Sequence, residues 1–231
     1  MARSRIRFPI YIRRGEVLVV GHSGAVQPAT EPEDPNATNR RRGVAMAGHL
    51  GDTTSARAGL SDPAPMVRST ALGALERLGS LSDAELSNGL RDDDPVVRRR
   101  AAELTATHPG ADLLPSLDDP DPSVVEMAAW AAGEREEEAA VDRLALMAMG
   151  DTGHVDPLCR EAAVAALGAI GDPAGLSAVL AALDDKPAIR RRAAVALAAF
   201  EGPEVDAALR RCLGDRDWQV RQVAEDLLAI D

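Results

Sequence analysis

The chain has 231 residues and a formal net charge of −11, with 45% hydrophobic but only 2% aromatic residues. A core of this kind must be built from Ala, Leu and Val, and helices keep Ala at no propensity cost, so the composition favours an all-α fold. The charge is uneven, because residues 1–43 hold eight Arg against four acidic residues and the remaining chain carries a net −15. An acidic domain repels a phosphate backbone, which argues against nucleic-acid binding.

Residues 1–34 differ from the rest of the chain and stand outside any repeat. Pro, Thr and acidic residues dominate 27–35, a linker composition. Residues 8–20 fit either a short strand or a disordered segment. The apolar run at 17–20 is too short for a signal-peptide core, and no run reaches the length of a membrane span. We therefore expect a variable or disordered segment over 1–34, one folded domain over 35–231 and a cytoplasmic location.

A short motif recurs at nearly regular intervals from residue 65 onward. It consists of Pro, an apolar residue and Arg, as in Pro65, Val67 and Arg68. The copies begin at residues 65, 95, 122, 157, 187 and 218. Arg40 and Gly43 fit the same pattern in a degraded seventh copy upstream. A period of about thirty residues is typical of stacked repeats, in which one unit cannot bury its apolar face alone.

Each repeat has the pattern of two helices. The second helix begins at the Pro, which suits a first helical turn because it needs no N–H partner there. First helices are indicated at 173–183 and 203–213, and Ser82 with Glu85 forms a capping-box pattern that opens another. We expect an α-solenoid of about six to seven stacked helix pairs. An insertion at 150–156 separates the third and fourth copies, which should therefore meet irregularly.

The motif resembles a known repeat family. The spacing Asp-x-x-x-x-Val-Arg-x-x-Ala-x-x-Ala-Leu is similar to the short bacterial HEAT repeat, first named for phycobilisome lyases, and residues 166–173 and 184–190 carry it most clearly. The resemblance extends over about residues 35–231. It implies an array whose second helices line a concave face. Members of the family range from enzymes to inert scaffolds, so the resemblance specifies fold more than function.

Asp and Arg recur six residues apart at the start of four second helices. We expect these turn carboxylates to accept charge-assisted hydrogen bonds from the Arg side chains, forming a structural ladder that fixes the orientation of the repeats. The ladder residues are Asp62, Arg68, Asp92, Arg98, Asp184, Arg190, Asp215 and Arg221. The pattern fails twice, because Asp119 is followed by Val125 and Arg160 is preceded by His154.

Two Arg triplets and one Trp suggest a surface for a partner. Residues 98–100 and 190–192 read either as solvated, self-neutralised faces or as contacts for an acidic peptide or phosphate. Trp130 lies at an offset that points away from the core positions, so we expect an exposed side chain on the open helix face, and Trp and Met are frequent interface anchors. The candidate partner-binding residues are Trp130, Met127, Arg99, Arg100, Glu103, Arg191 and Arg192.

Enzymatic signatures are weak. The deoxyhypusine hydroxylases, a HEAT-repeat enzyme family, bind iron through His-Glu pairs, and none of the four His in this chain precedes a Glu. The insertion gathers Asp151, His154, Asp156 and Cys159, a minor metal-site hypothesis, but Cys159 occupies a core position. We expect Cys159 and Cys212 to be buried thiols in a reducing compartment. The sequence therefore predicts no catalytic residues, no metal site and no cofactor.

The pattern as a whole favours a non-enzymatic bacterial scaffold. We expect a monomer that binds a protein partner on its concave second-helix face. The alternatives are an enzyme of the bilin-lyase or hydroxylase-like branches and, more weakly, a nucleic-acid binder such as the HEAT-like DNA glycosylases. An enzyme would require titratable side chains that converge in one cleft.

Overall fold

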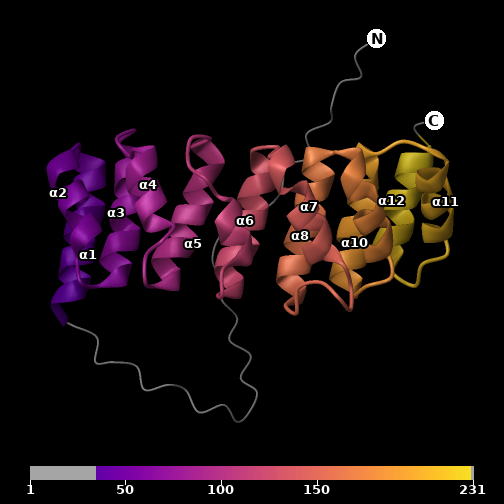
Figure 1. Ribbon diagram of the computed structural model, residues 1–231, viewed down its shortest axis with the longest axis horizontal. Coiled ribbons are helices and arrows are strands. Elements are labelled where there is room, and N and C mark those ends of the chain that lie inside the picture. The colour runs from indigo at the N-terminus through magenta and orange to yellow at the C-terminus, as the bar shows by residue number, and fades with distance from the viewer. Residues whose placement is uncertain (1–34, 230–231) are drawn as a thin grey trace, which may run out of the picture. The chain divides into compact units, whose positions relative to one another are not determined.

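The computed structural model describes residues 35–229, and these residues form helices and connecting turns without a strand. The helices stand side by side in one row, from α1 and α2 at one end to α11 and α12 at the other (Figure 1). The second helices of the repeats are α1 (Pro35–Leu50), α3 (Pro65–Arg77), α5 (Pro95–Leu104), α6 (Pro122–Glu134), α8 (Pro157–Ile170), α10 (Pro187–Ala196) and α12 (Trp218–Leu228). The predicted segment 1–34 lies outside the described residues.

The first helices form the other layer. They are α2 (Thr53–Ala58), α4 (Asp83–Gly89), α7 (Val141–Ala148), α9 (Leu176–Ala182) and α11 (Pro203–Cys212). Single 3-10 turns extend or replace parts of helices at η1 (Gly59–Ser61), η2 (Thr105–Thr107), η3 (Leu114–Asp118), η4 (Glu138–Ala140), η5 (Pro173–Gly175) and η6 (Leu197–Ala199). Among the described residues, no helix is long and apolar enough to cross a membrane.

Local sequence signals account for most helix starts. Pro occupies the first turn of α3, α5, α6, α8, α10 and α11. The side chains of Asp94, Asp121 and Asp156 cap α5, α6 and α8 by accepting a hydrogen bond from the backbone N–H two residues on. Ser82 and Glu85 form the predicted capping box of α4. The predicted first helices over 173–183 and 203–213 are confirmed by η5 with α9 and by α11.

The third repeat departs from the expected helix pair. Its first element is only the 3-10 turn η3, because the spacing between the motif at 95 and the motif at 122 is the shortest in the array. The chain compensates with side chains, since Arg135 donates hydrogen bonds to the backbone oxygens of Pro109 and Ala111, and Arg143 donates one to that of Leu114. The expectation of two full helices in every repeat was therefore wrong here.

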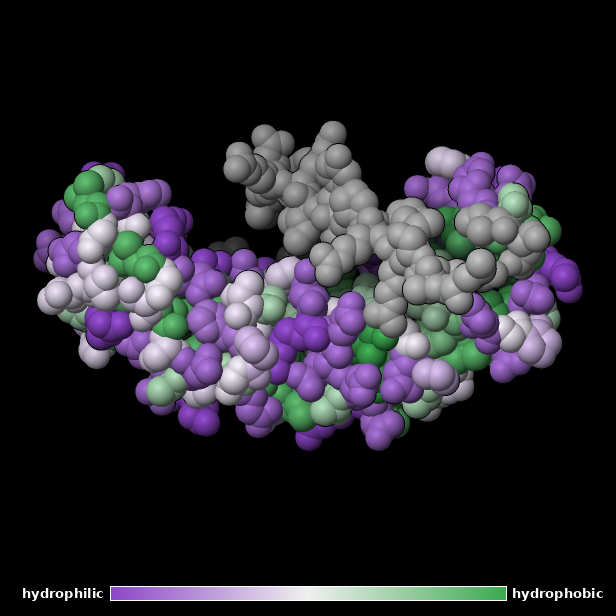
Figure 2. Space-filling model, turned by 90° about the horizontal axis from the view of Figure 1, so that it is seen from above, coloured by the Kyte–Doolittle hydropathy of each residue, from purple (hydrophilic) through white to green (hydrophobic). Residues whose placement is uncertain are grey.

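The second helices form the inner layer of the curved row. Each of them contacts the next along the whole series, whereas contacts between first helices are sparse. Helices on the inside of a curve lie closer together than those outside, so the second helices lie on the concave side. The space-filling view shows the curvature of the repeat domain (Figure 2).

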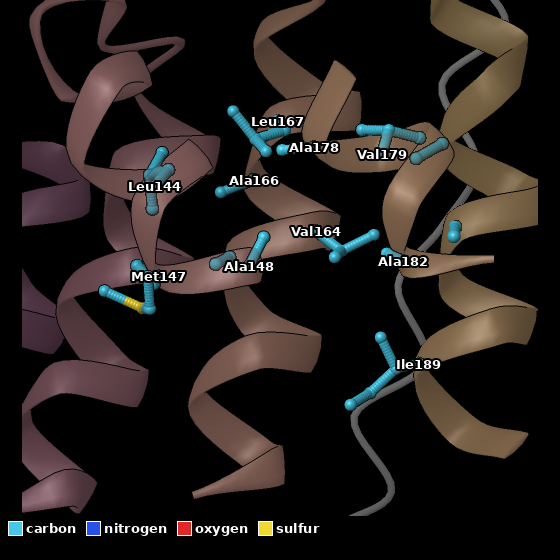
Figure 3. Packing of buried hydrophobic residues seen from close by; sticks show 14 of the residues in the cluster. Leu144, Met147, Ala148, Val164, Ala166, Leu167, Ala178, Val179, Ala182 and Ile189 are labelled. Carbon is cyan, nitrogen blue, oxygen red and sulfur yellow. The ribbon is translucent and has the colours of Figure 1, made fainter. Parts of the chain in front are cut away.

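The core lies between the two layers and is built from Ala, Leu, Val and Ile. Leu144 and Met147 of α7, Leu167 of α8, Val179 of α9 and Ile189 of α10 belong to one cluster of buried side chains (Figure 3). The buried side chains divide into one cluster from Val44 to Ala111 and another from Ala102 to Ala224. The division falls where the third repeat lacks a full first helix.

Glycine allows three pairs of second helices to approach closely. A Cβ atom built on Gly48, Gly133 or Gly168 would lie 3.0 Å or less from the Cα of an Ala in the next second helix, which is Ala74, Ala166 or Ala196 respectively. These contacts leave no room for a methyl group, so the Gly residues set the spacing of α1 with α3, α6 with α8 and α8 with α10.

We predict that Gly168→Ala destabilises the protein although Ala is the better helix former. The new methyl group would lie 2.7 Å from the Cβ and 2.8 Å from the Cα of Ala196, so α8 and α10 must separate. The expected loss is about 1–3 kcal/mol, the usual cost of overpacking. Gly43→Ala is the control, because a Cβ atom at that exposed position in α1 meets nothing within 4 Å. It should stabilise by about 0.5–1 kcal/mol. Thermal unfolding followed by circular dichroism compares the two variants, and a Gly168→Ala midpoint at or above the parent value would contradict the close-contact argument.

Candidate functional site

Arg–Asp pairs join successive repeats along the array. The guanidinium of each Arg donates through Nε and Nη2 to both carboxylate oxygens of an Asp in the next repeat. Arg68 pairs with Asp92 at 2.7 and 2.8 Å, and Arg98 pairs with Asp119 at 2.7 and 2.9 Å. The remaining pairs in the described residues are Arg40 with Asp62, Arg160 with Asp185 and Arg190 with Asp215. Bidentate pairs of this kind fix both distance and angle.

The same Arg side chain also anchors its own repeat. Nη1 of Arg68 donates to the backbone oxygen of Asp62, six residues earlier, and Arg98 and Arg221 repeat this bond to Asp92 and Asp215. Each guanidinium therefore ties the turn before its own helix to the turn before the next second helix.

The sequence identified the right residues for most of the ladder but paired them wrongly. It predicted side-chain pairs within a repeat, such as Asp62 with Arg68, whereas the carboxylate belongs to the following repeat. The six-residue spacing instead reflects the bond from the Arg side chain to a backbone oxygen. Asp184 was also wrong, because Asp185 accepts the hydrogen bonds from Arg160 and the turn before α10 is one residue shorter.

The ladder lacks its rung between α6 and α8 within the described residues. Val125 stands at the Arg position and is buried, and His154 stands at the Asp position. The Nδ1 atom of His154 accepts the N–H of Asp156 at 3.1 Å, which is the bond that a ladder Asp makes in its own turn, as Asp92 does with Asp94. Asp119 and Arg160 belong to intact rungs, so one junction departs from the pattern rather than two.

Cys159 bridges this junction in a different way. Its Sγ donates to the backbone oxygen of Pro122 at 3.2 Å, across from α8 to α6. Burial raises the pKa of the Cys159 thiol to about 12, so the thiol keeps the proton that this bond requires. The four residues of the insertion do not assemble a metal site: Asp156 caps α8, Nδ1 of His154 is occupied and Cys159 is protonated. Within 35–229 no group of three or more His, Cys, Asp or Glu could hold a metal ion.

Apolar side chains are exposed on the concave side of the second helices. Residues that follow the opening Pro and residues seven positions later share the face opposite the core. Met66 of α3, Val96 of α5, Leu158 of α8 and Val195 of α10 are 41%, 42%, 56% and 40% exposed. They were not predicted from the sequence, although their shared position directly after the Pro, or two turns on, was a usable signal. Trp218, at the Pro position of α12, is 65% exposed.

Most of the predicted Arg contacts are satisfied within the protein. Arg100 pairs with Glu103 of the same helix at 2.7 Å, and its guanidinium covers Gly73 of α3. Arg191 pairs with Asp217 at 2.6 Å, and Arg192 reaches Glu161 of α8 at 3.5 Å. Arg99 is exposed. The triplets are thus largely self-neutralised faces.

Trp130 and Met127 are less accessible than predicted. Both side chains are half-buried, and Met127 packs against the apolar core. The expectation of a largely exposed Trp130 was therefore wrong, because the offset along a helix does not show how much of a side chain the surrounding residues cover. Part of Trp130 still faces solvent on the concave side.

Glu126, which the sequence analysis did not single out, lies one turn before Trp130 on α6. Two positions can be compared at each junction of second helices: the fifth residue of one helix and the sixth residue of the next. At the junction of α8 with α10 these positions hold Glu161 and Arg192, which form an ion pair. At the junction of α6 with α8 the corresponding positions hold Glu126 and Ala162, so the second position carries no cation to pair with the carboxylate. Burial is the main cause that raises the pKa of Glu126; the charges of Asp156 and Glu161 add to it, and Arg99 opposes it.

His108, which follows η2, joins the first and second repeats. Its Nε2 lies 2.6 Å from Glu76 Oε2 of α3, and its Nδ1 lies 3.3 Å from Asp83 Oδ1 of α4. Burial alone would lower the pKa of His108, but the hydrogen bonds and charges of the two carboxylates outweigh it and raise the pKa. Both ring nitrogens face carboxylates, so the arrangement favours an imidazolium over a metal ligand.

The fold defines an α-solenoid of stacked helix pairs with a structural ladder. The family profile of the HEAT repeats matches residues 84–155 and 152–229, and the chain therefore belongs to the HEAT-repeat family. A search of curated protein sequences found no match. The YibA protein of Escherichia coli is similar in structure, with a TM-score of 0.58 and 17% identity over 88% of this chain and 77% of that chain. This likeness shows the fold alone.

Two further solved structures align with lower scores. A designed armadillo repeat protein has a TM-score of 0.47 and 16% identity over 86% of this chain and 94% of its own. Human deoxyhypusine hydroxylase in complex with glycerol has a TM-score of 0.43 and 22% identity over 86% of this chain and 81% of its own.

We predict that Arg190→Ala destabilises the array through the loss of one rung. Arg190 is buried, and its removal takes away both guanidinium hydrogen bonds to the Asp215 carboxylate, which keeps only the N–H of Asp217, and the donor to the backbone oxygen of Asp185. The expected cost is about 1–3 kcal/mol. Arg191→Ala is the matched control, because it removes only an exposed ion pair with Asp217 and should cost below about 1 kcal/mol. Equal denaturation midpoints for the two variants would refute a structural role specific to the ladder.

We predict that His108→Gln costs stability mainly at low pH. Because the folded-state pKa of His108 is raised, its stabilising effect is complete below the unfolded pKa of about 6.5 and fades as pH rises through the higher folded value. The difference in unfolding free energy between parent and variant should be about 1 kcal/mol at pH 5.5 and should shrink towards pH 9. Denaturation at several pH values measures this difference, in which the titrations common to both proteins cancel. A difference that stays constant or grows with pH would contradict the imidazolium assignment.

Proposed function

We propose that the chain is a non-enzymatic, monomeric scaffold of the cytoplasm that binds a protein segment on the concave face of its second helices. The observation that carries the proposal is the row of exposed apolar side chains at Met66, Val96, Leu158 and Val195. Single exposed apolar residues are ordinary, but their recurrence on one face of four helices of the same layer favours an interaction surface.

The geometry of the row suits an extended polypeptide. Packed helices lie about 8–10 Å apart, which corresponds to roughly three residues of extended chain at 3.3–3.6 Å each. An extended segment could therefore place one side chain on each second helix it crosses. Interleaved charged side chains, such as Arg99 and Glu126, provide positions that discriminate between partners.

The rigidity of the array supports the same role. Two layers of packed helices and the Arg–Asp rungs hold the concave face in one shape, so a partner binds a surface that is formed beforehand. Preorganisation of this kind lowers the entropic cost of binding.

Site-specific photo-crosslinking tests the proposal. A photo-reactive amino acid at Val195 on the inner face of α10 is compared with the same residue at Leu146 on α7, which is 71% exposed in the first-helix layer. In lysate of the source organism, we expect the inner position to form a discrete covalent adduct with a protein and the outer position to form none. Adducts from Leu146 alone, or equal labelling from both positions, would contradict binding on the concave face.

A further inference from the structure

Two neighbouring second helices carry an unbalanced acidic surface on the concave side. The sequence of α6 contains no Lys or Arg, and the one basic residue of α8 is Arg160, which is buried in the ladder. Three carboxylates lie on the solvent-facing positions of these helices, at Glu126, Glu134 and Glu161. We call the surface formed by Glu126, Trp130, Leu158, Glu161 and Glu134 the acidic inner face.

Glu126 is the carboxylate at the centre of this surface. No hydrogen bond or ion pair links it to another side chain in the part of the chain that the structure describes, in contrast to Glu161, which reaches Arg192 at 3.5 Å. A partly buried carboxylate that lacks a donor costs free energy, which a cation from outside the chain would recover. The raised pKa of Glu126 agrees with this position.

Trp130 supplies the second element of recognition. It follows Glu126 by four residues, so the two side chains are neighbours on the same face of α6. An indole ring attracts a Lys or Arg head group to its face and accepts the methylene stem of the same side chain along its surface. Leu158, which is 56% exposed in the first turn of the neighbouring helix α8, adds an apolar side chain to the acidic inner face.

We propose that the acidic inner face binds a basic protein segment, with one Lys or Arg side chain over Trp130 and its charge against Glu126. The inference rests on the proposed function and adds the chemistry of the partner. Charge complementarity selects a basic segment, because the residues beyond position 43 carry a net −15 and the inner faces of α6 and α8 present carboxylates without a free cation. Arg99 of α5 and Arg192 of α10 flank the surface and limit the basic contact to the two central helices.

The direct test uses a pentapeptide of alternating lysine and leucine as the probe. In the full chain with Trp218→Phe, Trp130 is the one remaining tryptophan, so its emission reports binding at this surface. At about 0.15 M salt, where long-range attraction is screened, we expect the peptide to shift the emission saturably. The matched peptide with acetylated lysines should leave it unchanged.

Matched charge variants identify the carboxylate. Glu126→Gln should weaken binding of the lysine peptide about tenfold. Glu138→Gln changes the net charge by the same amount at an exposed position in η4 and should leave affinity unchanged. Isothermal calorimetry measures both variants, and Trp130→Leu should lose affinity by a similar factor with its helical circular-dichroism spectrum retained.

Three results would overturn the inference. They are equal binding of the acetylated peptide, equal loss in the two Glu variants, and calorimetric binding that leaves the Trp130 emission unchanged. Failure here is distinguishable from failure of the scaffold proposal, because the adduct formed through Val195 does not depend on the partner's charge. If the Val195 adduct still forms in the Glu126→Gln variant, that result supports the concave binding face and contradicts the proposal of a basic partner.

Discussion

The bidentate bond from an Arg of one repeat to an Asp of the next is the interaction on which the regularity of the array depends. Helix pairs built from Ala and Leu could slide against each other, because small apolar side chains give similar contacts in several registers. A guanidinium fork accepts a carboxylate in one geometry only. Buried ion pairs often contribute little net stability, since desolvation opposes the attraction. The rungs are therefore better understood as devices that select one register, while the free energy of folding comes from the apolar core.

The ladder also shows how far the sequence alone could be read. Period, helix starts, caps and the Arg and Asp positions follow from local rules, and these were predicted correctly for α4, α9 and α11. Pairing between repeats is not local, because Arg68 is equally compatible in sequence with Asp62 and Asp92. The turn geometry decides, since it turns the carbonyl of Asp62 towards the guanidinium and the carboxylate of Asp92 across the junction. The one-residue shift from Asp184 to Asp185 likewise depends on a turn conformation that spacing cannot specify.

The inner face shows a second limit of prediction from sequence, which concerns how exposed a side chain is and which partner it has. Helical periodicity predicts that Trp130 points away from the core positions of α6, but its exposure depends on the residues packed around it. The Trp130 side chain is half-buried in the folded chain, which its position along the helix did not indicate. Glu126 was missed for a related reason: its significance comes from Ala162 in the neighbouring helix, where the next junction has a cation. The exposure of Trp130 and the lack of a partner for Glu126 both depend on residues outside their own helix.

The missing rung has a consequence for how such a chain can be rearranged. In each complete rung the Arg reaches forward to the following unit, so the ladder is directional and a regular unit carries one donor and one acceptor. Val125 and His154 occupy the donor and acceptor positions on the two sides of one junction, so both partners of the usual rung are absent there. Joining the third repeat directly to the fifth would set Val125 opposite Asp185, and the buried carboxylate of Asp185 would then lack an Arg donor. Joining the second to the fourth would set Arg98 opposite His154. Units on either side of this junction can be duplicated or deleted among themselves, whereas an exchange across it joins halves that do not match.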